Sequence, residues 1–362
     1  MPYHVRYLLS LFIVACSLLA PAGHLAYAHT FSTSESAQFL SLVDQIRAQT
    51  RLVAMNLENN NITLAQAHAE EASDLLNNFT LDELRERNVR IAESLDTGLE
   101  NLENNITSMA TATQDQIPQD RIQIINQTIM TLNDLLAEAV TVRVESEQLN
   151  NATTWAMVLA DLTNVVLSNY GNATGAPFDL TDMSNLPGME GMEMDHSGNT
   201  TMTMMDQGQM QMQMSRNSSN NNTVTIRANA TSSMSNMTAT IVDTAAYESA
   251  QYLANNTILQ LFNDMLKPLT ISADEASIGN NNATAMVQQG QNNVAQDNST
   301  ASNIDALEAK LLQLKDDISG KATPEEVMTT VHLGIHPLLI QLYGLTIANQ
   351  EGEEHTDHAG VQ

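Results

Sequence analysis

The sequence predicts an all-α protein, an amphipathic helical bundle of about seven to eight helices interrupted by a long polar insert. Three observations support this fold class. Apolar residues recur at spacings of three and four along most of the chain, as in helices with one buried face. No segment alternates apolar and polar residues as a half-buried strand would. Short turns rich in asparagine separate the periodic segments, which is typical of antiparallel helices.

The N-terminal helical region, residues 29–170, contains five predicted helices. The first follows Ser32-x-x-Glu35, which has the pattern of a capping box. The fifth is apolar on most of its sides, so we expect it to be central. The helices are expected over about 33–58, 63–76, 80–106, 118–140 and 152–167.

Periodicity is lost in residues 171–236, where Gly, Asn, Ser, Thr, Gln and Met dominate. Such a composition cannot bury enough apolar surface for a packed core, so we expect a disordered insert. The C-terminal helical region covers 237–350, and residues 351–362 are an acidic tail with two histidines. The pattern leaves open whether the helices before and after the insert form one bundle or two.

Charge and composition restrict the possible partners. Acidic residues outnumber basic ones 42 to 14, for a formal net charge of −28. A surface this negative repels phosphate backbones and anionic membranes, which argues against nucleic-acid and lipid-headgroup binding. The same charge attracts cations, including metal ions.

The first 28 residues have the pattern of a cleavable signal peptide. Arg6 precedes an apolar run from Leu8 to Ala20, and Ala26-Tyr27-Ala28 is an A-x-A cleavage signature. The run is too short to span a membrane. We therefore expect a secreted, extracellular or cell-surface protein without direct membrane insertion after cleavage.

The single cysteine, Cys16, lies within this signal. The mature chain would therefore have neither a disulfide nor thiol chemistry. In an alternative interpretation Ile13-Val14-Ala15-Cys16 is a lipobox and the cysteine carries a lipid anchor. The apolar residues after Cys16 fit the core of a signal peptide better.

N-glycosylation sequons agree with export, because only an exported chain is modified at them. Five of the first six lie in the predicted helix breaks or at helix ends, where a glycan would remain in solvent. An Asn- and Thr-rich chain also produces such triplets by chance. The five predicted glycosylation sites are Asn61, Asn78, Asn105, Asn151 and Asn172.

Methionine is concentrated in and directly after the insert, since 12 of the chain's 20 methionines lie between Met183 and Met237. A polar segment gains nothing in folding from thioethers, whereas thioether sulfur with occasional imidazole selects Cu(I). The alternatives are compositional drift in a linker and a sacrificial oxidant sink. The candidate ligands are Met189, Met192, Met194, His196, Met202, Met204, Met205, Met210, Met212 and Met214.

Within this segment, Met192-Glu-Met194-Asp195-His196-Ser197 resembles the Met-Asp-His-Ser repeats of exported bacterial copper-resistance proteins. The resemblance implies a ligand type and no shared fold. The His-Cys-His pattern of multicopper oxidases is absent from the sequence. In its many sequons, its signal and its lack of cysteine, the chain also resembles surface glycoproteins of archaea, particularly copper-dependent ammonia oxidisers.

Histidines outside the insert supply further candidate ligands. Cleavage after Ala28 would leave His29 first, similar to the histidine brace of copper monooxygenases, in which a second His completes the site. His332 and His336 are four residues apart on one face of the last helix, and Met328 extends the row. The alternative is that these two His flank the core and make ordinary hydrogen bonds.

Two other sets of histidines favour structural or solvated roles. His68 lies on an apolar helix face, and we expect a buried ring paired with a carboxylate, with Glu71 one turn away. His355 and His358 lie in the acidic tail and are interpreted as solvated.

The expected function is therefore an exported copper-binding protein that delivers, buffers or detoxifies copper. Its partners would be copper ions and a membrane-bound or surface copper protein. One alternative is a structural or interaction glycoprotein of the cell surface without metal. The other is a copper redox component with a brace at His29. No P-loop, nucleophile elbow or dinucleotide fingerprint occurs in the sequence, which lowers the expectation of an enzyme.

Overall fold

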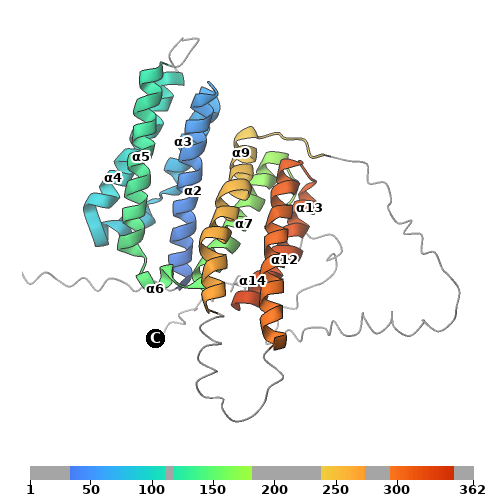
Figure 1. The fold of residues 1–362 in the computed structure, drawn as a ribbon. Coiled ribbons are helices and arrows are strands. Elements are labelled where there is room, and N and C mark those ends of the chain that lie inside the picture. Colours follow the sequence, from blue (N-terminus) through green and yellow to red (C-terminus); the bar gives the residue numbers. More distant parts are fainter. Residues whose placement is uncertain (1–32, 111–117, 182–237, 274–293, 346–362) are drawn as a thin grey trace, which may run out of the picture.

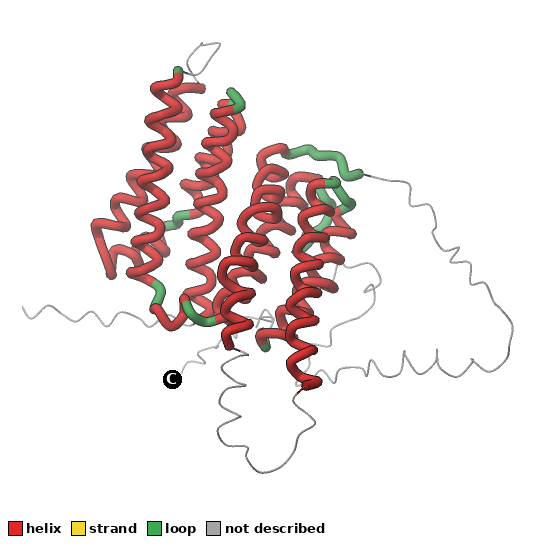
Figure 2. The backbone as a smooth tube through the Cα atoms, in the orientation of Figure 1, coloured by secondary structure: helices red, strands yellow, loops and turns green. Residues whose placement is uncertain are grey.

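The computed structural model describes residues 33–110, 118–181, 238–273 and 294–345. Within these ranges every regular element is a helix and no strand occurs (Figure 2). They contain eight long helical segments and the single-turn helix α6. The predicted all-α bundle is therefore confirmed.

The N-terminal half is a closed four-helix bundle (Figure 1). Each helix packs against the next in sequence, and α5 returns to α2 to close the ring. Helix α6 (Ser146–Leu149) then leads into the second half. The four helices are α2 (Thr33–Glu58), α3 (Ile62–Leu75), α4 (Asn78–Ala110) and α5 (Gln119–Arg143).

The C-terminal half forms a second ring of four helical segments, in which π-helical turns carry the label η (Figure 1). Helix α7 contacts α9 and α14, and α12 contacts η2 and η4, which closes the ring. The segments are α7 (Ala152–Thr174); α9 (Thr244–Tyr252) continuing through η2 (Leu253–Ile258), α10 (Leu259–Leu261) and η3 (Phe262–Leu266); α12 (Val294–Ser319); and α13 (Pro324–Thr329) continuing through η4 (Thr330–Ile335) and α14 (His336–Tyr343).

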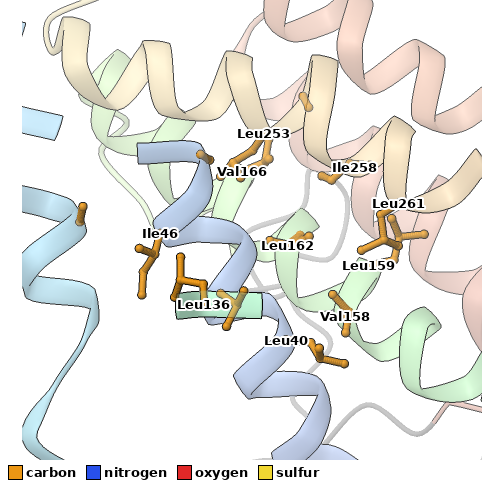
Figure 3. Close-up of a cluster of buried hydrophobic side chains, with 14 of the residues drawn as sticks. Leu40, Ile46, Leu136, Val158, Leu159, Leu162, Val166, Leu253, Ile258 and Leu261 are labelled. Atoms are coloured by element: carbon orange, nitrogen blue, oxygen red, sulfur yellow. The ribbon is translucent and has the colours of Figure 1, made fainter. Parts of the chain in front are cut away.

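The two rings share one continuous apolar core. Helix α2 packs against both α7 and α9, and α3 also contacts α9, so these four helices form the seam. Figure 3 shows side chains from α2, α5, α7 and η2 meeting there. Burial of this apolar surface is the main force that holds the halves together. The labelled contributors are Leu40, Ile46, Leu136, Val158, Leu159, Leu162, Val166, Leu253, Ile258 and Leu261.

Helix α7 is the central element, as its apolar sequence predicts. It contacts α2 on one side and α9, η3, α13 and α14 on others. Its buried residues include Trp155, Leu162 and Tyr170. It is longer than expected, ending at Thr174, where Gly175 adopts a left-handed conformation with φ 62°. Residues 171–181, placed in the insert from sequence, thus include the last turn of α7 and the loop after it.

Side-chain caps begin several of these helices. Asn61 Oδ1 accepts from Leu64 N–H at the start of α3, and Asn151 Oδ1 accepts from Thr153 N–H at the start of α7. Thr323 and Glu326 form a capping box at the start of α13. Asparagine is a favoured N-cap because its side chain satisfies a free backbone N–H. Capping therefore accounts for sequon asparagines at helix breaks without any glycan.

The placement of one sequon is corrected by the structure. Asn105 lies inside α4, which continues to Ala110, and is half-buried. The apolar periodicity predicted that this helix ends near Ile106. In the structure Met109, one turn further on, is also buried against the core. Asn78 and Asn151 are exposed at helix starts, and Asn172 is exposed in the last turn of α7.

The described helices were also compared with the requirements for crossing a membrane. None of them combines sufficient length with sufficient apolar character to form a span.

Candidate functional site

Two groups of histidines lie inside the described fold. The first is centred on His68 of α3, which is fully buried. Its Nδ1 lies 2.8 Å from Gln49 Oε1 on α2, and its Nε2 lies 3.1 Å from Glu248 Oε2 on α9. Asn56 Nδ2 donates to the same Glu248 oxygen at 2.7 Å. Both ring nitrogens are thus engaged, and the ring joins helices from both halves.

The neighbours of His68 extend this polar network across the seam. Gln49 Nε2 donates to Ser249 Oγ at 3.0 Å, and Ser249 Oγ donates to Glu71 Oε2 at 3.3 Å. Burial lowers the pKa of His68, although Glu248 acts in the opposite direction. Burial raises the pKa of Glu71. The expectation of a buried histidine paired with a carboxylate is confirmed, but the partner is Glu248 from α9, which sequence spacing cannot reveal.

The second group is the histidine pair, His332 and His336, on the helix that runs from α13 to α14. His332 is 2% exposed and so does not flank the core as the apolar stripe suggested. The two rings meet edge to face, with centroids 5.1 Å apart and an interplanar angle of 76°. The structure therefore brings together the pair that sequence spacing proposed, with His332 buried and His336 half-buried.

Hydrogen bonds orient both rings. His332 Nε2 lies 2.8 Å from the carbonyl oxygen of Leu180, an acceptor, so Nε2–H donates. His336 Nε2 lies 3.2 Å from Thr163 Oγ1, and this hydroxyl also donates to Ala160 O at 2.7 Å. A metal-binding histidine usually has this arrangement, with its other N–H donated to an oxygen.

The electrostatic environment keeps His336 neutral. Burial lowers its pKa to about 4, and the neighbouring His332 ring contributes to the same shift. At neutral pH the ring thus carries no proton that a metal ion would have to displace. Neutral imidazole is the form that binds metals.

A π turn, η4, explains why this helix places two neighbouring rows of side chains towards the protein interior, an apolar stripe and the row that contains the two histidines. In an α-helix each four-residue step drifts by about 40° around the axis. The wider π turn, which includes His332, reduces this drift. The core stripe therefore keeps a spacing of four residues up to Leu339. The stripe is Val327, Val331, Ile335 and Leu339, and the row beside it is Met328, His332 and His336.

Glycine permits the close packing of η4 on its other side. Gly334 is buried against α12, where a Cβ would lie 2.9 Å from Lys310 Cδ. The helix is thus held between α12 and α7, with the two histidines towards α7. No sequence signal predicted the π turn or the distant Leu180 carbonyl.

The remaining candidate ligands lie outside the described residues. These include His29, His196 and the methionines from Met189 to Met214. The last described residue before them is Thr181, one residue after Leu180, whose carbonyl accepts from His332. Along the chain, the methionine-rich segment from Met183 thus begins three residues after a hydrogen-bonding partner of the histidine pair.

Among the residues with described positions, no three His, Cys, Asp or Glu side chains gather in a group that could hold a metal ion. Comparisons with protein-family models, curated proteins and solved structures found no match to the chain.

Proposed function

We propose that this protein is an exported copper-binding protein that delivers, buffers or detoxifies copper outside the cell. The methionine-rich segment 183–214 with His196 would supply most of the ligands. Thioether and imidazole are soft to intermediate donors, and a cysteine-free mature chain offers no softer ligand. The net charge of −28 raises the local concentration of cations at the surface.

One structural observation supports this proposal most directly. The hydrogen bond from His332 Nε2 to the Leu180 carbonyl holds the His332 imidazole, with the His336 ring beside it, next to the loop that leads into the methionine-rich segment. The methionine-rich segment begins at Met183, three residues after Leu180 along the chain.

Copper titration of the mature protein tests this function. Anaerobic Cu(I) and aerobic Cu(II) would be titrated against competing chelators, for the intact chain and for a chain lacking residues 183–214. We expect several tightly bound Cu(I) ions per intact chain and a clear drop in stoichiometry on deletion. Binding in neither form, or only at micromolar affinity or weaker, would contradict the proposal and favour a structural surface protein.

The brace hypothesis is separated from the copper-carrier hypothesis by the same titration. Tight Cu(II) binding that survives the deletion but is lost in His29→Ala would indicate a brace. N-terminal sequencing of the exported protein must first show that His29 is the first residue.

A further inference from the structure

The polar network at the seam consists of Gln49, His68, Glu71, Glu248 and Ser249, and the direction of each of its hydrogen bonds depends on the others. We infer that this network is a proton-coupled latch between the two halves, in which His68 and Glu71 share one proton. Gln49 and Ser249 connect the two residues. The inference concerns the bundle itself and is independent of the proposed copper binding.

The latch is buried at the place where the two halves meet. Gln49 comes from α2, His68 from α3 and Ser249 from α9, and each of the three is at most 2% exposed. Glu71 lies one turn after His68 on α3, and Glu248 precedes Ser249 on α9; both carboxylates are half-buried. The hydrogen bonds between these side chains are thus polar contacts that hold α9 against α2 and α3.

Both ring nitrogens of His68 face oxygen acceptors. Nδ1 lies 2.8 Å from Gln49 Oε1, and Nε2 lies 3.1 Å from Glu248 Oε2. A neutral imidazole carries hydrogen on only one nitrogen, so it can satisfy only one of these acceptors. The arrangement is complete when the ring is charged, because Gln49 then donates to Ser249 and Ser249 donates to Glu71.

A second arrangement satisfies the same groups with a neutral ring. When the Gln49 amide rotates by half a turn, its NH₂ group donates to His68 Nδ1 and its oxygen accepts from Ser249. The Ser249 hydroxyl lies within 3.4 Å of both the Gln49 oxygen and Glu71 Oε2, so it changes its acceptor by rotation alone. Glu71 thereby loses its buried donor, and a protonated carboxyl can donate to Ser249 instead.

The two arrangements hold the same number of protons. In the first, His68 is charged and Glu71 is ionised, whereas in the second both are neutral. Glu248 accepts in both, since Asn56 Nδ2 donates to its Oε2 at 2.7 Å. The proton that the ring releases to water is matched by one that Glu71 takes up, and Gln49 transmits only an orientation. Groups coupled in this way titrate as a pair.

The surroundings of the pair disfavour a charge on either member. Burial lowers the pKa of His68, and Glu248 and Asp243 act in the opposite direction. Burial also raises the pKa of Glu71, which a hydrogen bond from Ser249 opposes and Asp243 increases. The acting charges thus lie on α9 and at its start. From α2 and α4, the other helices that pack against α3, no charged side chain among the described residues shifts either pKa.

Two separate pH steps therefore act on the contact between the halves. The raised pKa of Glu71 contributes stability that is present below its unfolded value of 4.5 and is lost as the pH rises through the folded pKa. The pair then holds no proton, and one buried acceptor lacks a donor. His68 has the opposite sign, because its lowered pKa means that stability is lost as the pH falls below 6.5.

The test is a double-mutant cycle in the full chain, measured at the ring of His68. Glu71→Gln removes the second proton site but keeps an amide that can donate to Ser249. Ser249→Ala removes the hydroxyl that connects Glu71 with Gln49, and it changes the buried volume little. A third variant combines both substitutions. Long-range ¹H–¹⁵N spectra at a series of pH values give the protonation and tautomer of the ring, and chemical denaturation shows that each variant is folded.

In the wild-type chain we expect the His68 ring to titrate in two steps, the upper one shared with Glu71. In Glu71→Gln only the lower step should remain, so the midpoint should fall by about 1 pH unit or more. In the Ser249→Ala background the same substitution should have a clearly smaller effect. Glu70→Gln is the matched control, since it removes an equal charge from the exposed side of α3 and should leave the titration unchanged.

Two results would overturn the inference. A single His68 step that Glu71→Gln does not move would show that the two residues share no proton. An equal effect of Glu71→Gln with and without the Ser249 hydroxyl would show that the Glu71 charge acts directly through space. If a variant does not fold, the wild-type chain decides: the ¹³C shift of the Glu71 carboxyl should follow the upper step of His68, and different midpoints would refute the latch.

Discussion

The two groups of buried histidines differ in what their second ring nitrogen contacts. His68 bonds an amide on α2 and a carboxylate on α9, so each nitrogen already serves the packing of the seam. In the histidine pair, each Nε2 bonds an oxygen and the Nδ1 atoms belong to two rings in edge contact. Burial alone therefore does not separate a structural histidine from a candidate ligand.

The largest effect that this comparison predicts is a loss of folding stability when the polar contacts of His68 at the seam are removed. His68→Leu leaves Gln49 and Glu248 without their shared ring, and it should lower the free energy of unfolding by about 3–4 kcal/mol. Copper binding should be unchanged at temperatures where the variant is folded. Chemical denaturation with a parallel Cu(I) titration measures both. A loss of copper with little loss of stability would reverse the roles assigned to the two groups.

Acid should destabilise the metal-free protein through the histidine pair. The pKa of His336 is lowered from an ordinary value near 6.5 to about 4, so the unfolded state binds the proton first. Stability is therefore complete above about pH 6.5 and falls as the pH drops, by about 3 kcal/mol at pH 4.

His336→Gln is the control for this acid sensitivity. It removes the titrating ring, so the change in unfolding free energy between pH 7 and pH 4 should shrink by a similar amount. Denaturant midpoints at both pH values give the comparison. An identical pH dependence in the variant would show that other groups, such as His68, dominate.

A substitution elsewhere on α7 should change stability without affecting either histidine group. Asn151→Ala removes the N-cap of α7 and should cost about 1 kcal/mol. Asn151→Ser keeps a capping oxygen and also removes the sequon, so it should be nearly neutral. Thermal unfolding of both variants measures the cap. Equal destabilisation in exported protein would mean that a glycan at Asn151 contributes instead.

The smallest predicted effect concerns the packing behind the histidine pair. Gly334→Ala gains about 1 kcal/mol of helix propensity but crowds the Lys310 side chain, so the net change should be within about 0.5 kcal/mol. With Lys310→Ala in the background, the full gain should appear. Stabilisation of similar size in both backgrounds would show that the Lys310 side chain moves aside at no cost in free energy. Gly334 would then not be required for packing.

The sequence predicted much of the fold because local patterns determine it. Periodicity predicted α2, α3, α4, α5 and α7 to within a few residues, except at the ends of α4 and α7. The central position of α7 followed from its apolar sequence. The burial of His68 followed from its place on an apolar face.

The candidate site was only partly predictable, because its decisive contacts are distant in sequence. The spacing of His332 and His336 put them on one face, but the π turn that buries His332 has no clear signature in the apolar pattern. The Leu180 carbonyl is 152 residues away from His332. Glu248 is 180 residues away from His68, so spacing suggested Glu71 instead.

The most direct test of the account is the protonation of the two rings in the folded protein. Long-range ¹H–¹⁵N spectra of histidine-labelled protein at pH 7 should show a neutral ring at His336 and hydrogen on Nε2 of His332. Addition of Cu(I) should then shift the ring of His196, a proposed ligand, while leaving His68 unchanged. A charged ring at His336, no hydrogen on Nε2 of His332, or no response of His196 to Cu(I) would contradict the account.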